Sequence, residues 1–210
     1  MGYMSILNGV IANDVLGSGD GKLLNDYLML MSIPLLGFIF TRRTMKYLSE
    51  DSYTRMLAYM RGLPIPNTVI LCKRKLQAVS SFCLNGILYF GFMYVASGNI
   101  RNELPPAAYL AFAITWVGYG LIVNGLYIFI EYSVSGKIYF ALTMIIVLLS
   151  LGGASLIYLA GGNLFLYSLN YSKEWTLLSP LMWGTLLLGT LSVQLFSKWT
   201  IHRLKSRDLV

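Results

Sequence analysis

The stretch that decides the fold is residues 138–160, which read IYFALTMIIVLLSLGGASLIYLA. It holds no Lys, Arg, Asp or Glu, and it exceeds the roughly 20 apolar residues that a helix needs to cross the hydrocarbon core of a bilayer. Three other uncharged stretches of comparable length occur in the chain, at residues 79–97, 107–130 and 177–197. We therefore expect transmembrane helices at these four positions.

The composition of the whole chain agrees with a membrane location. Of the 210 residues, 56% are hydrophobic and 12% are charged, and the mean hydropathy is +0.63. Soluble domains carry about 25% charged residues, and a soluble fold with so few would expose enough apolar surface to aggregate. The predicted fold class is therefore all-α: a polytopic integral membrane helical bundle with about five transmembrane helices.

One more span, the first along the chain, is expected at residues 23–41. Asp26 lies near its start and Pro34 lies inside it. Proline removes one helical hydrogen bond, so we expect a kink, which membrane helices tolerate. The apolar run before it, residues 6–12, is too short to span, and the glycine-rich residues 17–22 are expected to form a flexible turn.

The distribution of positive charge predicts the orientation. Residues 42–78 carry eight basic side chains, the tail at 198–210 carries four and the segment 131–137 carries one, whereas all the other segments together carry three. Lys and Arg near span ends are retained on the cytoplasmic side. We therefore expect a cell (plasma) membrane protein whose transmembrane domain is 23–197, with the loop 42–78 and the tail in the cytoplasm and the N-terminal segment 1–22 outside.

Polar side chains are sparse within the spans. Glu131 ends the span at 107–130, and we expect a solvated interfacial carboxylate there rather than a proton site. The remaining polar residues are expected to form hydrogen bonds between helices rather than to line a path: Asn85, Thr115, Asn124, Thr143, Ser155, Thr185 and Gln194. Glycines within the spans are expected to allow close helix approach: Gly86, Gly91, Gly118, Gly120, Gly125, Gly152 and Gly153.

The loop at residues 42–78 carries the clearest functional pattern. Residues 49–51, Ser-Glu-Asp, suit the N-terminus of a helix, and the turn Gly62-Leu63-Pro64 suits its end. Pro66 suits the first turn of a second, short helix that runs through residues 69–71 into the basic cluster before the next span. One face of the first of these helices is apolar and consists of Tyr53, Met56, Leu57 and Met60. Two interpretations are open: an interfacial helix that rests on anionic lipid, or a docking element for a cytoplasmic protein.

The order of these features resembles that of the permease subunits of type-2 ATP-binding-cassette exporters. In that family, the cytoplasmic loop after the second of six spans holds an acidic segment, a helix that ends in a Leu-Pro turn, and basic residues before the next span. The matching residues here are Ser49-Glu50-Asp51-Ser52, Arg61-Gly62-Leu63-Pro64 and Lys73-Arg74-Lys75. The start of the last span, Leu178-Ser179-Pro180, and the tail Ser206-Arg207-Asp208-Leu209 are similar as well.

The resemblance implies a permease subunit that moves substrate by conformational coupling to a separate cytoplasmic ATP-binding subunit. It also implies a second permease subunit, identical or related. The residues that it assigns to coupling are Tyr53, Met56, Leu57, Met60, Gly62, Leu63 and Pro64. Because the five expected spans match the family's second to sixth, we expect either that the first span is missing or that residues 1–12 are its short remnant.

No catalytic machinery is expected. The sequence has no phosphate loop, Ser–His pair or HExxH motif, so we predict no enzyme activity, no cofactor, no metal and no nucleic-acid partner. Cys72 and Cys83 fit no metal or redox spacing and are expected to be reduced structural thiols, and His202 lacks a neighbouring ligand. Two rival functions are a stand-alone membrane protein of the immunity or stress-response type, and an ion-coupled secondary transporter, which should carry charges within its spans.

Overall fold

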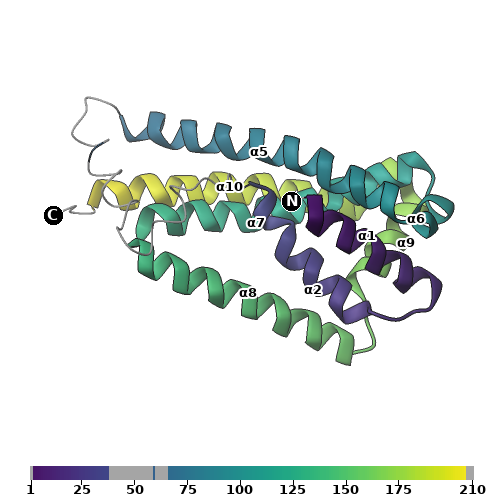
Figure 1. Ribbon diagram of the computed structural model, residues 1–210. Coiled ribbons are helices and arrows are strands. Elements are labelled where there is room, and N and C mark those ends of the chain that lie inside the picture. The colour runs from purple at the N-terminus through teal and green to yellow at the C-terminus, as the bar shows by residue number, and fades with distance from the viewer. Residues whose placement is uncertain (1, 38–58, 60–65, 207–210) are drawn as a thin grey trace.

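The computed structural model describes residues 2–37, Tyr59 and residues 66–206. Within these residues there is no strand, and four helices are long and apolar enough to cross a membrane. They are α5 (Asn67–Ala96), α7 (Pro106–Ser133), α8 (Gly136–Leu159) and α10 (Pro180–Ser206), and they run lengthwise through the molecule (Figure 1). The predicted all-α membrane bundle and its four uncharged spans are therefore confirmed.

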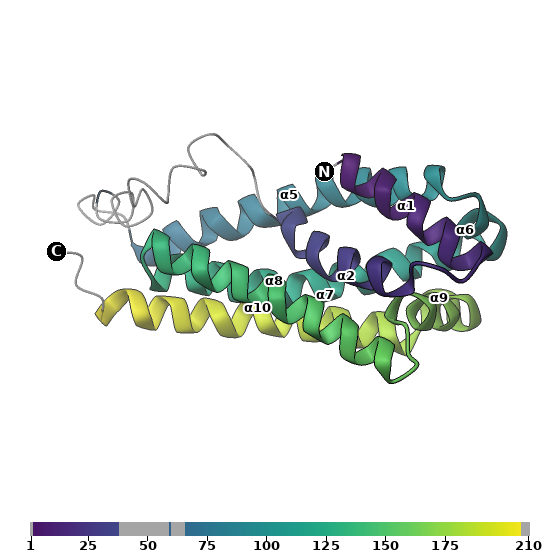
Figure 2. The ribbon, with the colours of Figure 1, turned by 60° about the horizontal axis from the view of Figure 1, so that its bottom comes forward.

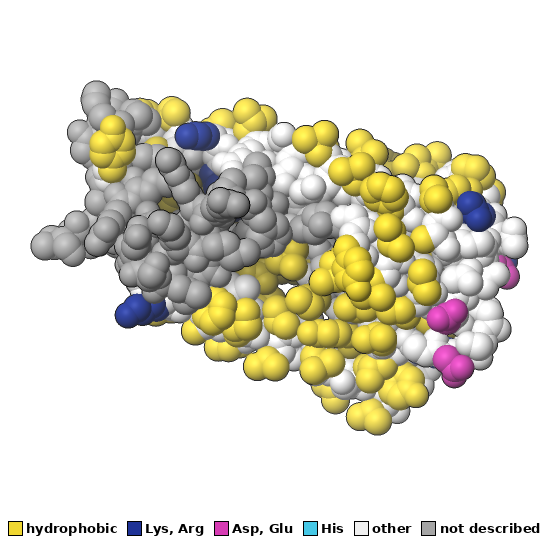
Figure 3. Space-filling model, in the orientation of Figure 1, with side chains coloured by type: hydrophobic (Ala, Val, Ile, Leu, Met, Phe, Trp, Pro, Cys, Tyr) yellow, Lys and Arg dark blue, Asp and Glu magenta, His cyan; other side chains and the backbone are white. Residues whose placement is uncertain are grey.

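The surface has the polarity of a membrane protein. Apolar side chains cover the middle of the molecule, whereas charged side chains lie toward its two ends (Figure 3). Leu148 and Leu149 of α8 are 65% and 68% exposed, and Ile87 of α5 is 73% exposed. One end of the bundle, where α5 and α8 begin and α7 and α10 end, carries Lys73, Lys75, Lys137, Lys198 and Arg203. We call it the basic end and the other the opposite end.

Two shorter helices form a hairpin in the half of the bundle nearer the opposite end (Figure 1). They are α1 (Gly2–Gly17) and α2 (Lys22–Ser32), of 16 and 11 residues, and neither is long enough to cross a bilayer. Gly19 and Gly21 have φ angles of 81° and 76° in the turn between them, a left-handed conformation that glycine adopts without steric cost. The predicted glycine turn is therefore confirmed.

The segment predicted as the first span is interrupted as expected at its proline. The α-helix ends at Ser32, and the chain continues as a short 3-10 helix, η1 (Pro34–Gly37). Pro34 has no N–H to donate, so the α-helical hydrogen-bond pattern stops there. Residues 38–41 lie outside the described residues, and the described part of this segment is not among the four long apolar helices.

Helix α5 begins earlier than the predicted span. Its first residue is Asn67, directly after Pro66, and the basic residues Lys73–Lys75 lie in its first turns. The sequence between Asn67 and Asn85 holds no glycine or proline, and a helix that has started extends at little cost per residue. The helix start predicted at Pro66 is therefore confirmed, and residues 67–78, predicted as part of the loop, belong to α5.

Three short helices close the opposite end: α6 (Gly98–Glu103), α9 (Leu164–Trp175) and η3 (Thr176–Leu178). Phe165 of α9 is fully buried, and its ring meets that of Phe112 edge to face, with centroids 5.7 Å apart. Trp116 donates a hydrogen bond of 3.1 Å to Ser168 Oγ of α9. These contacts hold α9 across the end of α7, as Figure 2 shows.

Helices α7 and α10 pack against each other closely along much of their length. A Cβ atom on Gly118 would lie 2.7 Å from the carbonyl carbon of Thr185, and one on Gly189 would lie 2.7 Å from the carbonyl oxygen of Gly118. Ser192 also donates a hydrogen bond of 3.0 Å to the carbonyl of Ile122. Glycine is therefore required on both helices, and α7 and α10 form one packed pair.

Candidate functional site

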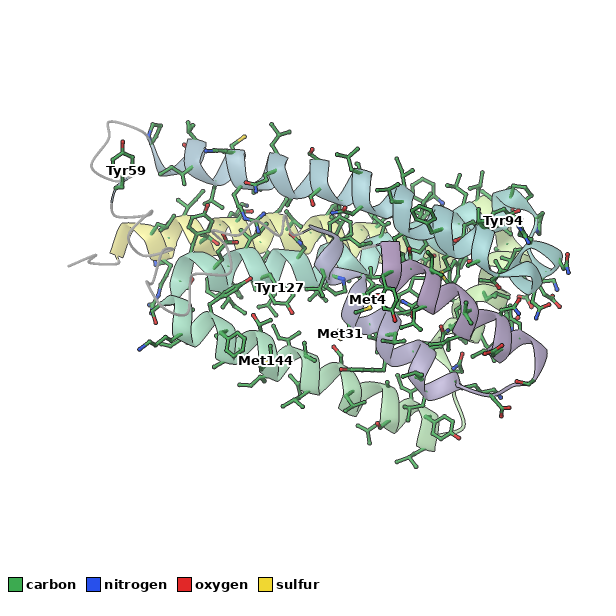
Figure 4. The ribbon with its side chains drawn as sticks, viewed as in Figure 1. Met4, Met31, Tyr59, Tyr94, Tyr127 and Met144 are labelled. Carbon is green, nitrogen blue, oxygen red and sulfur yellow. The ribbon has the colours of Figure 1, made fainter. Side chains whose placement is uncertain are left out.

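All seven residues predicted to couple the chain to a partner lie outside the described residues. They are Tyr53, Met56, Leu57, Met60, Gly62, Leu63 and Pro64. Tyr59, which lies among them in sequence, is described and is 72% exposed (labelled in Figure 4). The docking role stays a prediction. The elements on either side of the loop, η1 and α5, are described and can be analysed.

The chain that enters the loop is held by helix α5. The carbonyl oxygen of Leu36 in η1 accepts hydrogen bonds from Ser81 Oγ and from Asn85 Nδ2, both at 3.0 Å. Asn85 Nδ2 also lies 3.0 Å from Ser81 Oγ. Helix α5 thus supplies two side-chain donors to one backbone carbonyl of η1.

Helix α7 contacts the other side of the same segment. A Cβ atom on Gly37 would lie 2.0 Å from Asn124 Nδ2 and 2.8 Å from the ring of Phe82. A Cβ atom on Gly120 would lie 2.6 Å from the same ring. Glycine at both positions therefore lets η1 lie between α5 and α7. Asn124 is only 2% exposed, and its Nδ2 has no hydrogen-bond partner among the described residues.

A second polar cluster attaches the hairpin to α5. Asn8 of α1 donates hydrogen bonds to the hydroxyl of Tyr89 and, at 3.3 Å, to Ser32 Oγ of α2. Ser32 Oγ and the Tyr89 hydroxyl are 2.8 Å apart. Gly9 lies against α5 so closely that a Cβ there would be 2.7 Å from the Cβ of Ala96. The apolar run 6–12, too short to span, is thus part of the packed bundle.

An ion pair joins α5 and α7 near the basic end. Arg74 Nη2 lies 2.9 Å from Glu131 Oε2, and Arg74 Nε donates to the same oxygen at 3.0 Å. The two side chains are only 11% and 10% exposed. The expectation of a solvated carboxylate at Glu131 is therefore wrong. The reason is the early start of α5, which places Arg74 on a helix beside α7 rather than in a loop.

A buried carboxylate connects the hairpin to α9 at the opposite end. Asp26 of α2 is 1% exposed, and its two oxygens accept hydrogen bonds from the backbone N–H groups of Leu164 and Phe165, at 2.8 and 2.9 Å. These are first-turn donors of α9 that have no partner within the helix. Asp26 lies outside the four spans. Burial raises the pKa of its carboxyl group, and the two backbone hydrogen bonds oppose that rise.

Replacing Asp26 by Ala should loosen the hairpin and α9 together. The change leaves two N–H groups without acceptors, and a hydrogen bond to an ionisable group contributes about 1.5–3 kcal/mol. We expect a lower midpoint of thermal unfolding in detergent and faster amide hydrogen exchange at Leu164 and Phe165. Asp26→Asn, which keeps one acceptor oxygen, is the control and should lower the thermal midpoint by about half as much as Asp26→Ala does. Equal midpoints for the wild type and Asp26→Ala would contradict this assignment.

The other polar residues predicted between helices behave differently. The side chains of four of them bond to a carbonyl of their own helix: Thr115, Thr143, Ser155 and Thr185. Gln194 is exposed. Asn85 and Asn124 alone among the seven contribute to the cluster at η1. Of the predicted packing glycines, Gly118, Gly120 and Gly125 make close contacts, whereas four have nothing within 4 Å: Gly86, Gly91, Gly152 and Gly153.

The described residues contain no group of three or more His, Cys, Asp or Glu side chains that could hold a metal ion. Cys72 and Cys83 are free and exposed, so they are not packed structural thiols. Comparison of the chain with protein-family models, with curated proteins and with solved structures finds no match in any of the three.

Proposed function

We propose that the chain is the permease subunit of an ATP-driven exporter of the type-2 ATP-binding-cassette class, in the cell membrane and with its basic end in the cytoplasm. One observation carries the proposal. The segment 38–66, which holds the predicted coupling residues, is anchored to the same helix at both ends. It leaves η1, whose Leu36 carbonyl is bonded to Ser81 and Asn85 of α5, and it returns as the start of α5.

Because of this anchoring, a movement of the loop would be transmitted to the helices of the bundle. A partner that binds the loop pulls on η1 and on the start of α5 together, so that α5 moves as one body. The α7–α10 pair, packed through Gly118 and Gly189, provides the body against which it moves. The chain would then have two arrangements of α5 relative to the α7–α10 pair, and the partner favours one of them by binding it more tightly. ATP is bound and hydrolysed by the partner alone.

The charge distribution supports the proposed orientation. The described basic end carries Lys73, Lys75 and Lys137, which fits the cytoplasmic face by the positive-inside rule. A cytoplasmic ATP-binding subunit would therefore meet the loop on the correct side. The apolar outer face of α8, where Leu148 and Leu149 are exposed, is available to lipid or to the second permease subunit.

The test uses the full chain purified in mild detergent from membranes of the cells that express it. We expect a cytoplasmic ATP-binding protein to co-purify and to hydrolyse ATP faster with the chain than alone. The double variant Leu63→Ala/Pro64→Ala should still insert and should lose that stimulation, because it changes the turn that the sequence predicts at Gly62-Leu63-Pro64. Leu148→Ala on the exposed face of α8 is the control and should keep it.

The outcome separates this proposal from its rival. If no ATP-binding protein co-purifies with the wild-type chain, the chain is better assigned as a stand-alone membrane protein of the immunity or stress-response type. If the partner binds and the double variant stimulates it normally, the chain is a subunit of an ATP-driven assembly whose coupling residues lie elsewhere than Leu63 and Pro64.

A further inference from the structure

The outer face of α10 carries a row of leucines that ends in two basic residues. The row consists of Leu188, Leu191, Leu195, Lys198 and His202, separated alternately by three and four positions. Residues at this spacing share one face of a helix, and all five side chains are exposed. The close contacts of α10 with α7 are made by another face of the helix. We call these five residues the α10 row.

The length of the α10 row matches one leaflet of a bilayer. Lys198 follows Leu188 by ten positions, which at about 1.5 Å per residue is about 15 Å along the helix. The hydrocarbon core is about 30 Å thick, so each leaflet contributes about 15 Å. Helix α10 is long and apolar enough to span, and it ends at the basic end (Figure 2). The leucines are therefore placed at the depth of acyl chains, and Lys198 and His202 at the depth of headgroups.

The two basic side chains of the row have no acidic partner among the described residues. The ion pairs in this part of the chain involve other basic residues, and neither Lys198 nor His202 has a further interaction there. Basic groups four positions apart on a helix repel each other when both are charged. His202 can donate an N–H hydrogen bond in either protonation state. An anion that bridges the two side chains would therefore be bound favourably.

A tryptophan fixed by two neighbouring rings lies beside the basic residues. The ring centroid of Trp199 is 6.2 Å from that of Phe129 on α7 and 5.6 Å from that of Phe196, yet Trp199 is 52% exposed. The indole N–H groups of Trp116 and Trp183 donate to protein oxygens, whereas that of Trp199 has no acceptor in the described part of the chain. Such a side chain suits the interface, where its ring contacts acyl chains and its N–H reaches headgroups.

We propose that the α10 row binds an anionic phospholipid of the leaflet that faces the basic end. One acyl chain lies along the three leucines, and the phosphate lies between Lys198 and His202, with the Trp199 N–H as a further donor. A zwitterionic lipid has the same chains and phosphate, but it also carries a cation that the basic side chains repel. The surface therefore favours a lipid with net negative charge. This inference goes beyond the proposed function and does not depend on it.

The test measures which lipid lies next to Trp199 when the full chain is reconstituted in bilayers. Brominated acyl chains quench tryptophan fluorescence on contact, and the difference between the wild type and Trp199→Phe isolates the signal of this tryptophan. In mixtures of the two lipids, we expect brominated phosphatidylglycerol to be favoured at Trp199 over brominated phosphatidylcholine by at least about fivefold, the factor that one basic residue contributes near a membrane surface. Glycerol 3-phosphate, which lacks acyl chains, should not reduce this preference.

Removing the charge of the row should remove the preference. Lys198→Gln/His202→Gln should bring the quenching ratio of the two lipids to about one, whereas Lys198→Arg, which keeps the positive charge, should retain the preference. Lys137→Gln is the matched control, because it removes an exposed charge from α8 at the same end of the bundle but outside the row. It should keep the preference. All these side chains are exposed, so the variants should fold as the wild type does.

Three results would overturn the proposal. The first is equal quenching of wild-type Trp199 by the two lipids. The second is an equal loss of preference in Lys137→Gln and in the double variant, because the preference would then reflect the total charge of the basic end. The third is a loss of preference on addition of glycerol 3-phosphate, because the row would then bind a soluble phosphate. Since no ATP-binding protein is present, none of these results bears on the proposed partner.

Discussion

Arg74→Met should destabilise the protein by about 3–5 kcal/mol, because it leaves the Glu131 carboxylate buried without its counter-charge. The Glu131 side chain is only 10% exposed, so little water solvates its carboxylate. The free energy of unfolding can be measured by titration with sodium dodecyl sulfate in mixed micelles, with helical circular dichroism as the signal. Lys73→Met, which removes an exposed charge from the preceding position of α5, is the control and should change that free energy by less than about 0.5 kcal/mol.

The partner substitution completes a double-mutant cycle. Glu131→Leu alone should also be strongly destabilising, because it removes the carboxylate that lies 2.9 Å from the partly buried Arg74 guanidinium. The double variant Arg74→Met/Glu131→Leu should be more stable than either single variant, since no uncompensated charge remains. Additive losses in the double variant would show that the two side chains do not interact, and would remove the ion pair as the link between α5 and α7.

Gly118→Leu should disrupt the pair formed by α7 and α10. A Cβ at this position would lie 2.7 Å from the Thr185 carbonyl carbon and 2.8 Å from the Leu186 nitrogen, and backbone atoms cannot move aside as a flexible side chain can. Overpacking of this kind costs about 1–3 kcal/mol and sometimes more. We expect a lower thermal midpoint in detergent and a broader size-exclusion profile.

A glycine in another span supplies the control for that experiment. Gly152 of α8 has nothing within 4 Å of a built Cβ atom, so Gly152→Leu adds the same apolar volume to a span without steric conflict. Its thermal midpoint should equal or exceed that of the wild type, because leucine also favours the helix more than glycine does. Equal losses for Gly118→Leu and Gly152→Leu would mean that the close contact between α7 and α10 is absent in the membrane.

The parts of the fold that the sequence predicts are those set by local patterns. Four uncharged stretches became α5, α7, α8 and α10, because length and hydropathy alone decide whether a helix can span. Pro34 ended α2 because a missing N–H acts locally. Gly19 and Gly21 formed the turn because only glycine enters the left-handed region freely.

The remaining features depend on contacts between distant residues. The sequence pattern of residues 6–12 does not predict the hydrogen bond between Asn8 and Tyr89 or the close packing of Gly9 against Ala96. Asp26 reads as an unfavourable charge in a span, yet its partners are backbone groups of α9, far along the chain. The pairing of Arg74 with Glu131 required α5 to begin at Asn67, and helix ends are the least certain feature of a sequence pattern.

The half-length hairpin gives the described part of the molecule an unequal cross-section. Nearer the opposite end, α1 and α2 lie beside the four long helices, whereas nearer the basic end the described bundle consists of the four long helices alone. In a bilayer, these described helices would occupy more area on the side of the hairpin than on the side of the basic end. We therefore expect the lipid composition on the side of the hairpin to influence how stably α1 and α2 stay docked.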